Sequence, residues 1–159
     1  VRTKIKNYVC FRLATVFGHS YRMRSDLLVN NFTFTAVKKK KLTLFEPHFR
    51  RNFIHVRDVV NAIVFTMNNF SKMKNDVYNL GLSSANISKI MLAKKIQRQY
   101  KKLKIRIVTN RKDPDKRDYF VSNKKIEKKG FKASISLDKG ISELIQIFSN
   151  DKKKVINNY

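Results

Sequence analysis

Short apolar runs alternate with amphipathic segments along the chain, and this alternation predicts an α/β fold. Compact apolar or β-branched runs are typical of strands, whereas apolar residues that recur every three or four positions are typical of helices. We expect strands at 9–17, 42–45, 53–56, 77–80 and 105–108. We expect helices at 26–37, 59–67, 87–100, 123–129 and 140–148, with an extended segment at 119–121.

The first strand comes from a nearly continuous apolar run, Val9 to Phe17, which ends at Gly18. Such a run predicts a strand that is buried on both faces, as in parallel sheets. A strand of this kind needs neighbours, and only eight residues precede it. We therefore expect the chain to expose an apolar edge and to aggregate.

A strand leads directly into a helix in the octet Arg51–Asp58. Asp58 is a candidate N-cap, because its carboxylate can accept hydrogen bonds from free N–H groups of the first turn. Arg51 precedes the strand, where its planar guanidinium suits a phosphate or a diphosphate. The alternative is a surface arginine beside a core strand.

Helix ends carry further signals. The candidate N-caps are Ser84 or Asn86 for the helix at 87–100 and Asp138 for the helix at 140–148, and Gly130 is a candidate C-terminal residue. Residues 151–159 are expected to be a flexible tail.

The formal charge of +25 is the most unusual property of the composition. Such a charge attracts polyanions such as nucleic acid, acidic membranes or phosphorylated ligands. The lysines are spread over every segment, however, so solvated lysine-rich faces are the alternative that we favour. One cysteine, Cys10, excludes an internal disulfide, and no apolar stretch is long enough to span a membrane. A cytoplasmic protein is expected.

Several common motifs are missing from the sequence. Its four glycines form no phosphate-binding loop, and its three histidines are isolated from any metal-ligand spacing. The pattern Tyr100–Lys104 matches YxxxK, but a chance match is the simpler interpretation in a lysine-rich chain. Two arginine-bearing segments remain: Arg51, and the loop with Arg111, Asp115 and Arg117. Their side chains could converge on an anion, with Asp115 on a sugar hydroxyl and an amide from Asn30 or Asn31.

Four segments, taken in order, resemble a known family. They are Arg12–Gly18 with the following residues to Asn30, Arg51–Asp58, Val77–Gly81, and Asp113–Ser122 with the following residues to Phe131. Together they resemble the C-terminal half of the NAD-dependent epimerase/dehydratase family, the extended short-chain dehydrogenases/reductases that act on nucleotide sugars. The resemblance covers residues 8–148.

The resemblance implies a fold and a set of site residues. The fold is α/β, with the last part of a Rossmann-like parallel sheet and the small α/β substrate-binding domain. NAD is the implied cofactor, and a nucleoside diphosphate sugar is the implied substrate. Arg51 would bind the diphosphate, Asn30 would lie beside it, and Arg117 or else Arg111 would make the second phosphate or ribose contact. The turn from Thr15 through Val16 and Phe17 to Gly18 would lie against the nicotinamide.

The sequence also departs from the family. The glycine loop and the catalytic YxxxK of the family would both lie before Val1, so we assign a catalytic role to none of the residues in this sequence. We expect the chain to be inactive alone, as a fragment, a truncated product or one half of a two-chain enzyme. We divide it into residues 1–24, the end of an incomplete Rossmann domain; 25–150, the nucleotide-sugar-binding region; and the tail.

The partner expectations follow from these interpretations. A homodimer is expected of a full-length form, no membrane is expected, and nucleic acid is not the expected partner. Two alternatives stay open: a small basic domain that binds nucleic acid or another polyanion, and an inactive remnant.

Overall fold

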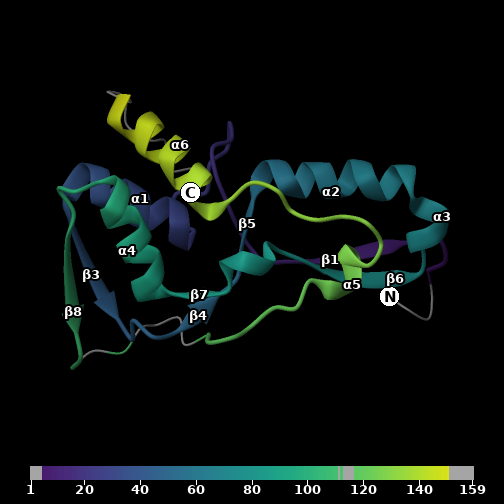
Figure 1. Ribbon diagram of the computed structural model, residues 1–159, viewed down its shortest axis with the longest axis horizontal. Coiled ribbons are helices and arrows are strands. Elements are labelled where there is room, and N and C mark those ends of the chain that lie inside the picture. The colour runs from purple at the N-terminus through teal and green to yellow at the C-terminus, as the bar shows by residue number, and fades with distance from the viewer. Residues whose placement is uncertain (1–4, 111, 113–116, 151–159) are drawn as a thin grey trace.

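The computed structural model describes residues 5–110, 112 and 117–150, which form an elongated molecule (Figure 1). Its strands are β1 (Val9–Leu13), β2 (Thr15–Phe17), β3 (Lys41–Phe45), β4 (Arg50–Arg51), β5 (Phe53–His55), β6 (Asp76–Leu80), β7 (Ile87–Ser88) and β8 (Lys104–Val108). Its helices are α1 (Leu28–Lys39), α2 (Val56–Asn68), α3 (Phe70–Met73), α4 (Lys89–Gln99), α5 (Lys124–Glu127) and α6 (Leu137–Asn150), with a 3₁₀ turn at Ser83–Ala85. The predicted α/β class is confirmed. The predicted tail at 151–159 lies outside the described residues.

β1 and β2 are two pieces of one extended stretch that changes partner at Ala14. β1 pairs in parallel with β6, whereas β2 pairs in parallel with β5, with Thr15 opposite Phe53. The N–H of Ala14 still reaches the carbonyl of Leu80, and the next N–H, that of Thr15, already reaches Asn52. The prediction of one strand buried on both faces is therefore wrong, and Leu13 keeps 51% of its surface exposed.

The other end of the molecule holds the remaining parallel pair, β3 with β8. Helices α1, α4 and α6 pack beside it and against one another (Figure 1). Between the two ends, β4 pairs antiparallel with β7, with Arg51 opposite Ile87. This short pair brings the segment before β5 against the start of α4.

The buried apolar side chains form two clusters. One lies among α1, β3, α4 and α6 and includes Phe17, Leu44, Leu92 and Phe148. The other joins β5, β6, α2 and α5, and β1 packs against it. Residues between 54 and 80 thus share a core with the N-terminal strand, so the packing runs across the predicted division at residue 24.

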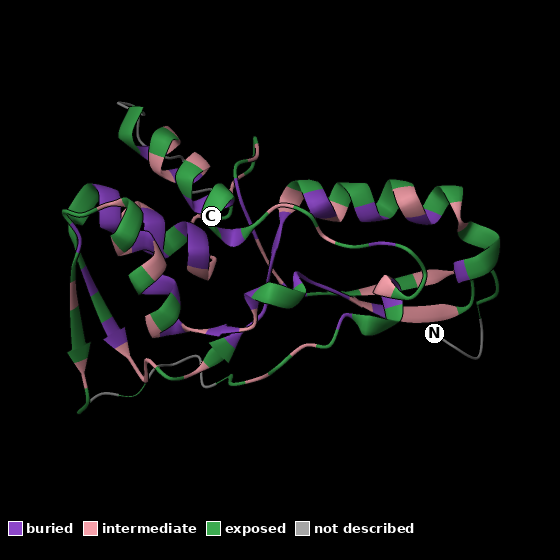
Figure 2. Cartoon of the chain, in the orientation of Figure 1, coloured by how far each residue is buried: buried purple, intermediate pink, exposed green. Residues whose placement is uncertain are grey.

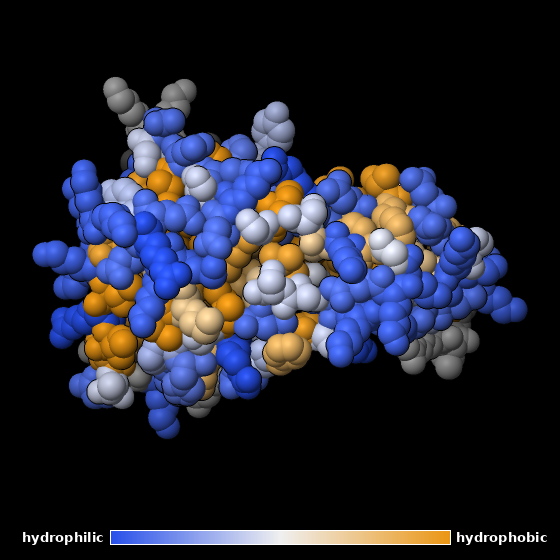
Figure 3. All heavy atoms as spheres, viewed as in Figure 1, coloured by the Kyte–Doolittle hydropathy of each residue, from blue (hydrophilic) through white to orange (hydrophobic). Residues whose placement is uncertain are grey.

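α2 carries an apolar stripe that points outward. Val60, Ile63, Val64 and Met67 recur at helical spacing, and each is between 46% and 70% exposed. The helix is largely exposed in Figure 2, and apolar atoms lie along it in Figure 3. The structure therefore leaves a continuous apolar helix face on the surface of the described chain.

Three predicted N-caps are wrong. His55 caps α2 through its imidazole, Ser88 caps α4, and the Ser136 hydroxyl accepts the N–H of Lys139 in the first turn of α6. Residues 119–121 form no strand. Gly130 does follow α5 with a φ of +102°, as a C-terminal glycine should. None of the described helices has the length and apolarity that crossing a membrane requires.

Candidate functional site

A basic cavity of about 610 Å³ lies where β1, β2, β4 and the start of α4 meet. Four cationic side chains contribute to its wall, with one carboxylate and one phenol. The lining residues include Arg24, Asp26, Arg51, Lys89, Arg117 and Tyr119. Its volume is in the range of sites that hold a small molecule or a cofactor.

Arg51 is a buried cation of this cavity. It keeps only 4% of its surface exposed. Its Nη1 donates a hydrogen bond of 3.0 Å to the carbonyl of Arg50, and its guanidinium lies 5.3 Å from the centre of the Tyr119 ring. The pairing of β4 with β7 fixes its backbone. A buried, oriented guanidinium of this kind is suited to bidentate recognition of a phosphate.

Arg117 reaches the same cavity because the chain beyond it is fastened to β4. The Asp118 carboxylate accepts hydrogen bonds from the N–H of Arg50 at 2.8 Å and from its Nε at 3.2 Å. The N–H of Tyr119 donates to the Arg50 carbonyl at 3.3 Å. The two hydrogen bonds from Arg50 to the Asp118 carboxylate, the backbone one foremost, hold the pKa of Asp118 below its usual value. Arg51 and Arg117, two of the three arginines that the sequence singled out, therefore line one cavity.

One part of the cavity lining is mostly apolar. Leu13, Ala14, Thr15 and Val16 line it. Phe17 lies elsewhere: it is buried, packs edge-on against His55, and lines a neighbouring cavity of about 320 Å³ with Val16 and Gly18. Of the predicted nicotinamide-side residues, Thr15 and Val16 border the basic cavity and Phe17 does not.

Asn30 is buried in α1 and bonds to the loop that follows β2. Its Oδ1 accepts the N–H of Gly18 at 3.0 Å, and its Nδ2 donates to the carbonyl of Arg24 at 3.1 Å. Asn30 lines the neighbouring cavity rather than the basic one. These bonds show that Asn30 shapes the loop carrying Arg24; its contact with a substrate stays a prediction.

Other site residues fall into two groups. Arg111 and Asp115, which the sequence also suggested, lie outside the described residues. Arg24, Lys89 and Tyr119 line the cavity but were not singled out from the sequence. Arg24 makes a bidentate ion pair with Asp26, at 2.8 and 2.7 Å. The sequence offered no signal for Lys89, because lysines are common throughout the chain.

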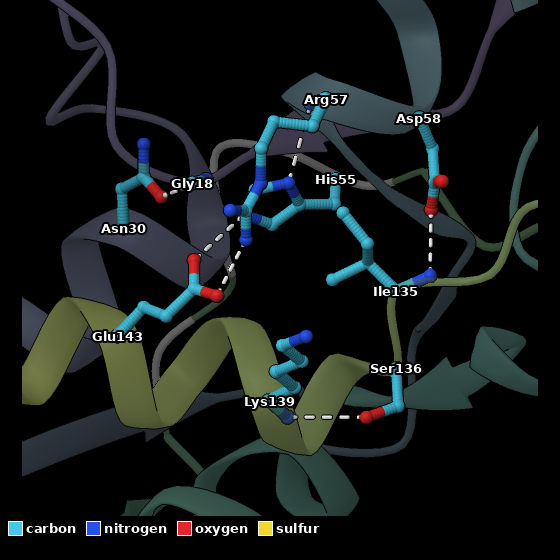
Figure 4. A network of polar contacts seen from close by, with 9 residues as sticks. All are labelled: Gly18, Asn30, His55, Arg57, Asp58, Ile135, Ser136, Lys139 and Glu143. Carbon is cyan, nitrogen blue, oxygen red and sulfur yellow. Dashed lines mark hydrogen bonds and ion pairs between the residues drawn. The ribbon is translucent and has the colours of Figure 1, made fainter. Parts of the chain in front are cut away.

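A second polar cluster surrounds His55, where β5 enters α2 (Figure 4). The imidazole Nδ1 accepts the N–H of Arg57 at 3.2 Å, and Nε2 lies 3.5 Å from the Glu143 carboxylate on α6. Arg57 also donates to Glu143 at 2.5 Å. Burial, aided by the charge of Arg57, lowers the pKa of His55, although Glu143 opposes the shift. The cluster joins α2 to α6 rather than facing the basic cavity.

Two other candidate chemistries find no support in the geometry. Tyr100 donates its hydroxyl to the Val37 carbonyl at 3.4 Å, and neither it nor Lys104 lines the basic cavity. Within the ranges that the structure describes, no cluster of three His, Cys, Asp or Glu side chains could hold a metal ion.

Comparison with known proteins now identifies the family. The sequence pattern of the NAD dependent epimerase/dehydratase family matches residues 2–81, half of the chain. The chain belongs to the NAD dependent epimerase/dehydratase family. The match includes β1, β2, Arg51 and β6, so several elements that build the cavity lie inside it.

Solved structures share the fold of this epimerase/dehydratase chain. UDP-glucose 4-epimerase from Thermotoga maritima, solved with UDP-glucose, matches with a TM-score of 0.73 and 23% identity over 91% of this chain and 46% of that chain. dTDP-glucose 4,6-dehydratase from Bacillus anthracis, solved with NAD, matches with a TM-score of 0.72 and 20% identity over 91% of this chain and 45% of that chain. UDP-glucose 4-epimerase from Thermus thermophilus, also solved with NAD, has a TM-score of 0.71 and 16% identity over 91% of this chain and 47% of that chain. The chain thus spans a little under half the length of these proteins.

Proposed function

We propose that this chain is the nucleotide-sugar-binding portion of an NAD-dependent epimerase/dehydratase, and that its basic cavity takes a nucleoside diphosphate sugar. The observation that carries the proposal is the convergence of Arg51 and Arg117 on one cavity. The two residues are far apart in sequence, and both the β4–β7 pair and the Asp118–Arg50 contact are needed to bring them together. Two guanidinium groups match the two phosphates of a diphosphate in charge and in geometry.

The sugar would extend from the arginines toward the apolar wall at Thr15 and Val16. The register brings Thr15 close to the arginine end of the cavity, because Thr15 lies opposite Phe53, two residues beyond Arg51. The aromatic ring of Tyr119, beside the Arg51 guanidinium, offers a flat surface at the cationic end. The residues of this chain therefore bind and orient the sugar nucleotide.

NAD is the cofactor of the family, and it supplies hydride transfer when bound. Thr15 and Val16 fit one edge of such a cofactor, because they line the cavity and their side chains are only partly buried. The sequence contains no glycine-rich loop to hold the cofactor phosphates. We therefore propose that the rest of the cofactor site and the catalytic tyrosine come from residues outside this sequence. NAD-dependent turnover by this chain alone is not expected.

Charge reversal in the cavity tests the proposal. Binding of UDP, dTDP, GDP and ADP is measured by calorimetry for the wild type and for Arg51→Glu and Arg117→Glu. We expect at least one nucleoside diphosphate to bind, and each reversal to weaken its binding by roughly 10- to 100-fold, since a charged hydrogen bond contributes about 1.5–3 kcal/mol.

Two matched controls carry the same charge change on exposed helix faces: Arg98→Glu on α4 and Lys39→Glu on α1. Both should bind like the wild type. Equal losses at all four positions would indicate a diffuse polyanion surface, and unchanged binding in Arg51→Glu would contradict the proposed site.

A further inference from the structure

His55 is buried where β2, α2 and α6 meet, with 1% of its surface exposed (Figure 4). A Cβ on Gly18 would lie 2.5 Å from its Nε2, and a Cβ on Gly140 would lie 3.0 Å from its Cδ2. Phe17 packs edge-on against the same ring, with 5.2 Å between the ring centroids. Two glycines and a phenylalanine therefore enclose the imidazole, and the ring cannot move far without displacing Gly18 or α6.

Gly18 connects this ring to the loop between β2 and α1. Its N–H donates to the Oδ1 of Asn30 at 3.0 Å, and the Nδ2 of Asn30 donates to the carbonyl of Arg24 at 3.1 Å. Asn30 thus links the start of this loop to Arg24. Arg24 lines both the basic cavity and its neighbour, and so do Val16 and Leu27. The position of Gly18 therefore bears on the shape of the basic cavity.

The imidazole fits this place in its neutral form. Its Nδ1 accepts the N–H of Arg57 at 3.2 Å and so caps α2, which leaves the proton of the neutral ring on Nε2. A second proton, on Nδ1, would face the Arg57 N–H, donor against donor. Relief requires the ring to move, and Gly18 is one of the backbone positions in its way.

Charged groups on α2 and α6 face the ring, and the loop after β2 adds one histidine. These groups are His19, Arg57, Asp58, Lys139 and Glu143. Glu143 lies 3.5 Å from Nε2 and favours a second proton on the ring, whereas burial and Arg57 disfavour it. Burial is the largest cause, and it lowers the pKa of His55 below its ordinary value of 6.5. The neutral form is therefore the one present at neutral pH.

We propose that neutral His55 is a positioning residue for the basic cavity: through Gly18 and Asn30 it holds the loop after β2 in the form that binds the ligand. The inference rests on the proposed function and adds to it a residue that does not contact the ligand. Ligand binding and protonation of His55 then oppose each other, and to the same extent in both directions. The affinity is highest above pH 6.5, where His55 is neutral, and it falls as the pH drops through the pKa of His55 in the ligand-free protein.

The cavity and a suitable ligand add no titration of their own to this pH range. None of the described residues that line the basic cavity is a histidine, the side chain that ordinarily titrates between about pH 5 and 8. The terminal phosphate of a nucleoside diphosphate titrates near about pH 6. A nucleoside diphosphate sugar has no terminal phosphate, so its charge stays constant. The probe is therefore UDP-glucose, or the ADP-, GDP- or dTDP-glucose that matches the nucleoside diphosphate bound most tightly.

Proton NMR of the wild type measures the linkage without any variant. The Cε1–H signal of each histidine is followed from pH 8 to pH 5, with and without a saturating concentration of the nucleotide sugar. The pKa of His55 should be lower with the ligand than without it, while that of the exposed His48 stays the same. A ligand that acted on His55 through its negative charge alone would raise this pKa. An unchanged or raised pKa of His55 would therefore overturn the inference.

Calorimetry of the same ligand gives the reciprocal test. The affinity of the wild type should fall by about twofold or more from pH 7.5 to pH 5. His55→Asn keeps an acceptor for the cap but cannot take up a proton, so its affinity should stay constant over this range. His48→Gln replaces an exposed histidine that lines neither cavity, and it should keep the pH dependence of the wild type. Circular dichroism sets the pH range in which each protein is folded.

A constant affinity of the folded wild type would show that His55 has a merely structural role, and this result would refute the inference alone. The same pH dependence in His55→Asn as in the wild type would place the titrating group elsewhere and would also refute it. A wild type that binds neither a nucleoside diphosphate nor its sugar at any pH would refute the proposed function, and this inference with it.

Discussion

The carboxylate of Asp58 accepts a hydrogen bond of 2.9 Å from the backbone N–H of Ile135, 77 residues further along the chain. It also accepts the N–H of Ser134 at 3.2 Å and the hydroxyl of the same residue at 3.3 Å. Asp58 is itself buried in the first turn of α2. Ser136, the next residue along, begins α6 by accepting the N–H of Lys139. Asp58 thus fastens the segment that leads into α6 to the first turn of α2.

Replacing Asp58 by alanine should lower the free energy of unfolding by about 2 kcal/mol, because two backbone N–H groups lose a partner in a partly buried place. Asp58→Asn should lower the free energy of unfolding by less, since its amide oxygen can still accept a hydrogen bond from these N–H groups. Urea unfolding followed by circular dichroism measures both. The control is Asp138→Asn, which removes only an exposed pair with Lys95 and should cost less than about 0.5 kcal/mol. Equal effects at the two positions would contradict this role of Asp58.

Gly140 lies in α6 against the His55 region. A Cβ at this position would lie 2.4 Å from Phe17 and 3.0 Å from His55. A glycine-to-alanine change inside a helix ordinarily stabilises by up to about 1 kcal/mol. Here Gly140→Ala should instead lower the free energy of unfolding by about 1–3 kcal/mol through overpacking.

Thermal and urea unfolding of Gly140→Ala show whether the change stabilises or destabilises the fold. Ser142→Ala, on the exposed side of the same helix, is the control. A Gly140→Ala protein more stable than the wild type would show that α6 does not press on Phe17 as described.

Protonation of His55 should destabilise the fold. Its pKa in the folded protein lies below 6.5, chiefly through burial, with Arg57 and Lys139 adding to the shift and Glu143 and Asp58 opposing it. Below pH 6.5 the unfolded chain therefore binds more protons than the folded one, and the free energy of unfolding falls as the pH drops toward the folded-state pKa. Above pH 6.5 the stabilisation is fully present.

The measurement is urea unfolding from pH 8 to pH 5 for the wild type and His55→Gln. The difference between the two curves isolates His55 from His19 and His48. The wild type should lose stability more steeply on acidification, and parallel curves would rule out a contribution from His55.

The exposed stripe on α2 should drive self-association of the chain. Sedimentation of the wild type is expected to depend on protein concentration, since contiguous apolar surface of this kind is rarely left bare. The double variant Val64→Glu with Met67→Lys should remove that dependence while changing the free energy of unfolding by less than about 0.5 kcal/mol. Asn61→Glu, an exposed polar site on the same helix, is the control. A wild type that stays monomeric at all concentrations would speak against an uncovered interface.

The longer strands and helices were predictable because their apolar periods are local, whereas the short elements β4, β7 and α3 were not predicted. The strand into α2 is one example: Phe53 and Ile54 are fully buried and the helix follows at once. The N-cap of α2 was predicted wrongly because short polar side chains such as Asp58 are the usual N-caps. In the structure the His55 imidazole caps the helix, and the Asp58 carboxylate instead accepts a hydrogen bond from a residue 77 positions away. The break at Ala14 was missed because a hydrophobic run does not say which strand will pair with it.

The candidate site was predictable only in part, because it depends on contacts between residues that are far apart in the sequence. Arg51 and Arg117 could be suspected from their places beside strand ends, but their meeting depends on the link between Asp118 and Arg50, 68 residues apart. Lys89 could not be recognised, since nothing local separates it from the many solvated lysines. Its burial arises from the turn between β3 and β4 folding over it.

Ligand titration of the wild-type chain tests the central claim most directly. Calorimetry compares the four nucleoside diphosphates, the corresponding nucleosides without phosphate, and a short DNA duplex at low and moderate salt. The account predicts saturable one-to-one binding of a nucleoside diphosphate, nucleosides weaker by roughly 100-fold, and duplex binding that fades as salt rises. Tight duplex binding with no saturable nucleoside diphosphate would contradict the account and favour a general polyanion-binding surface.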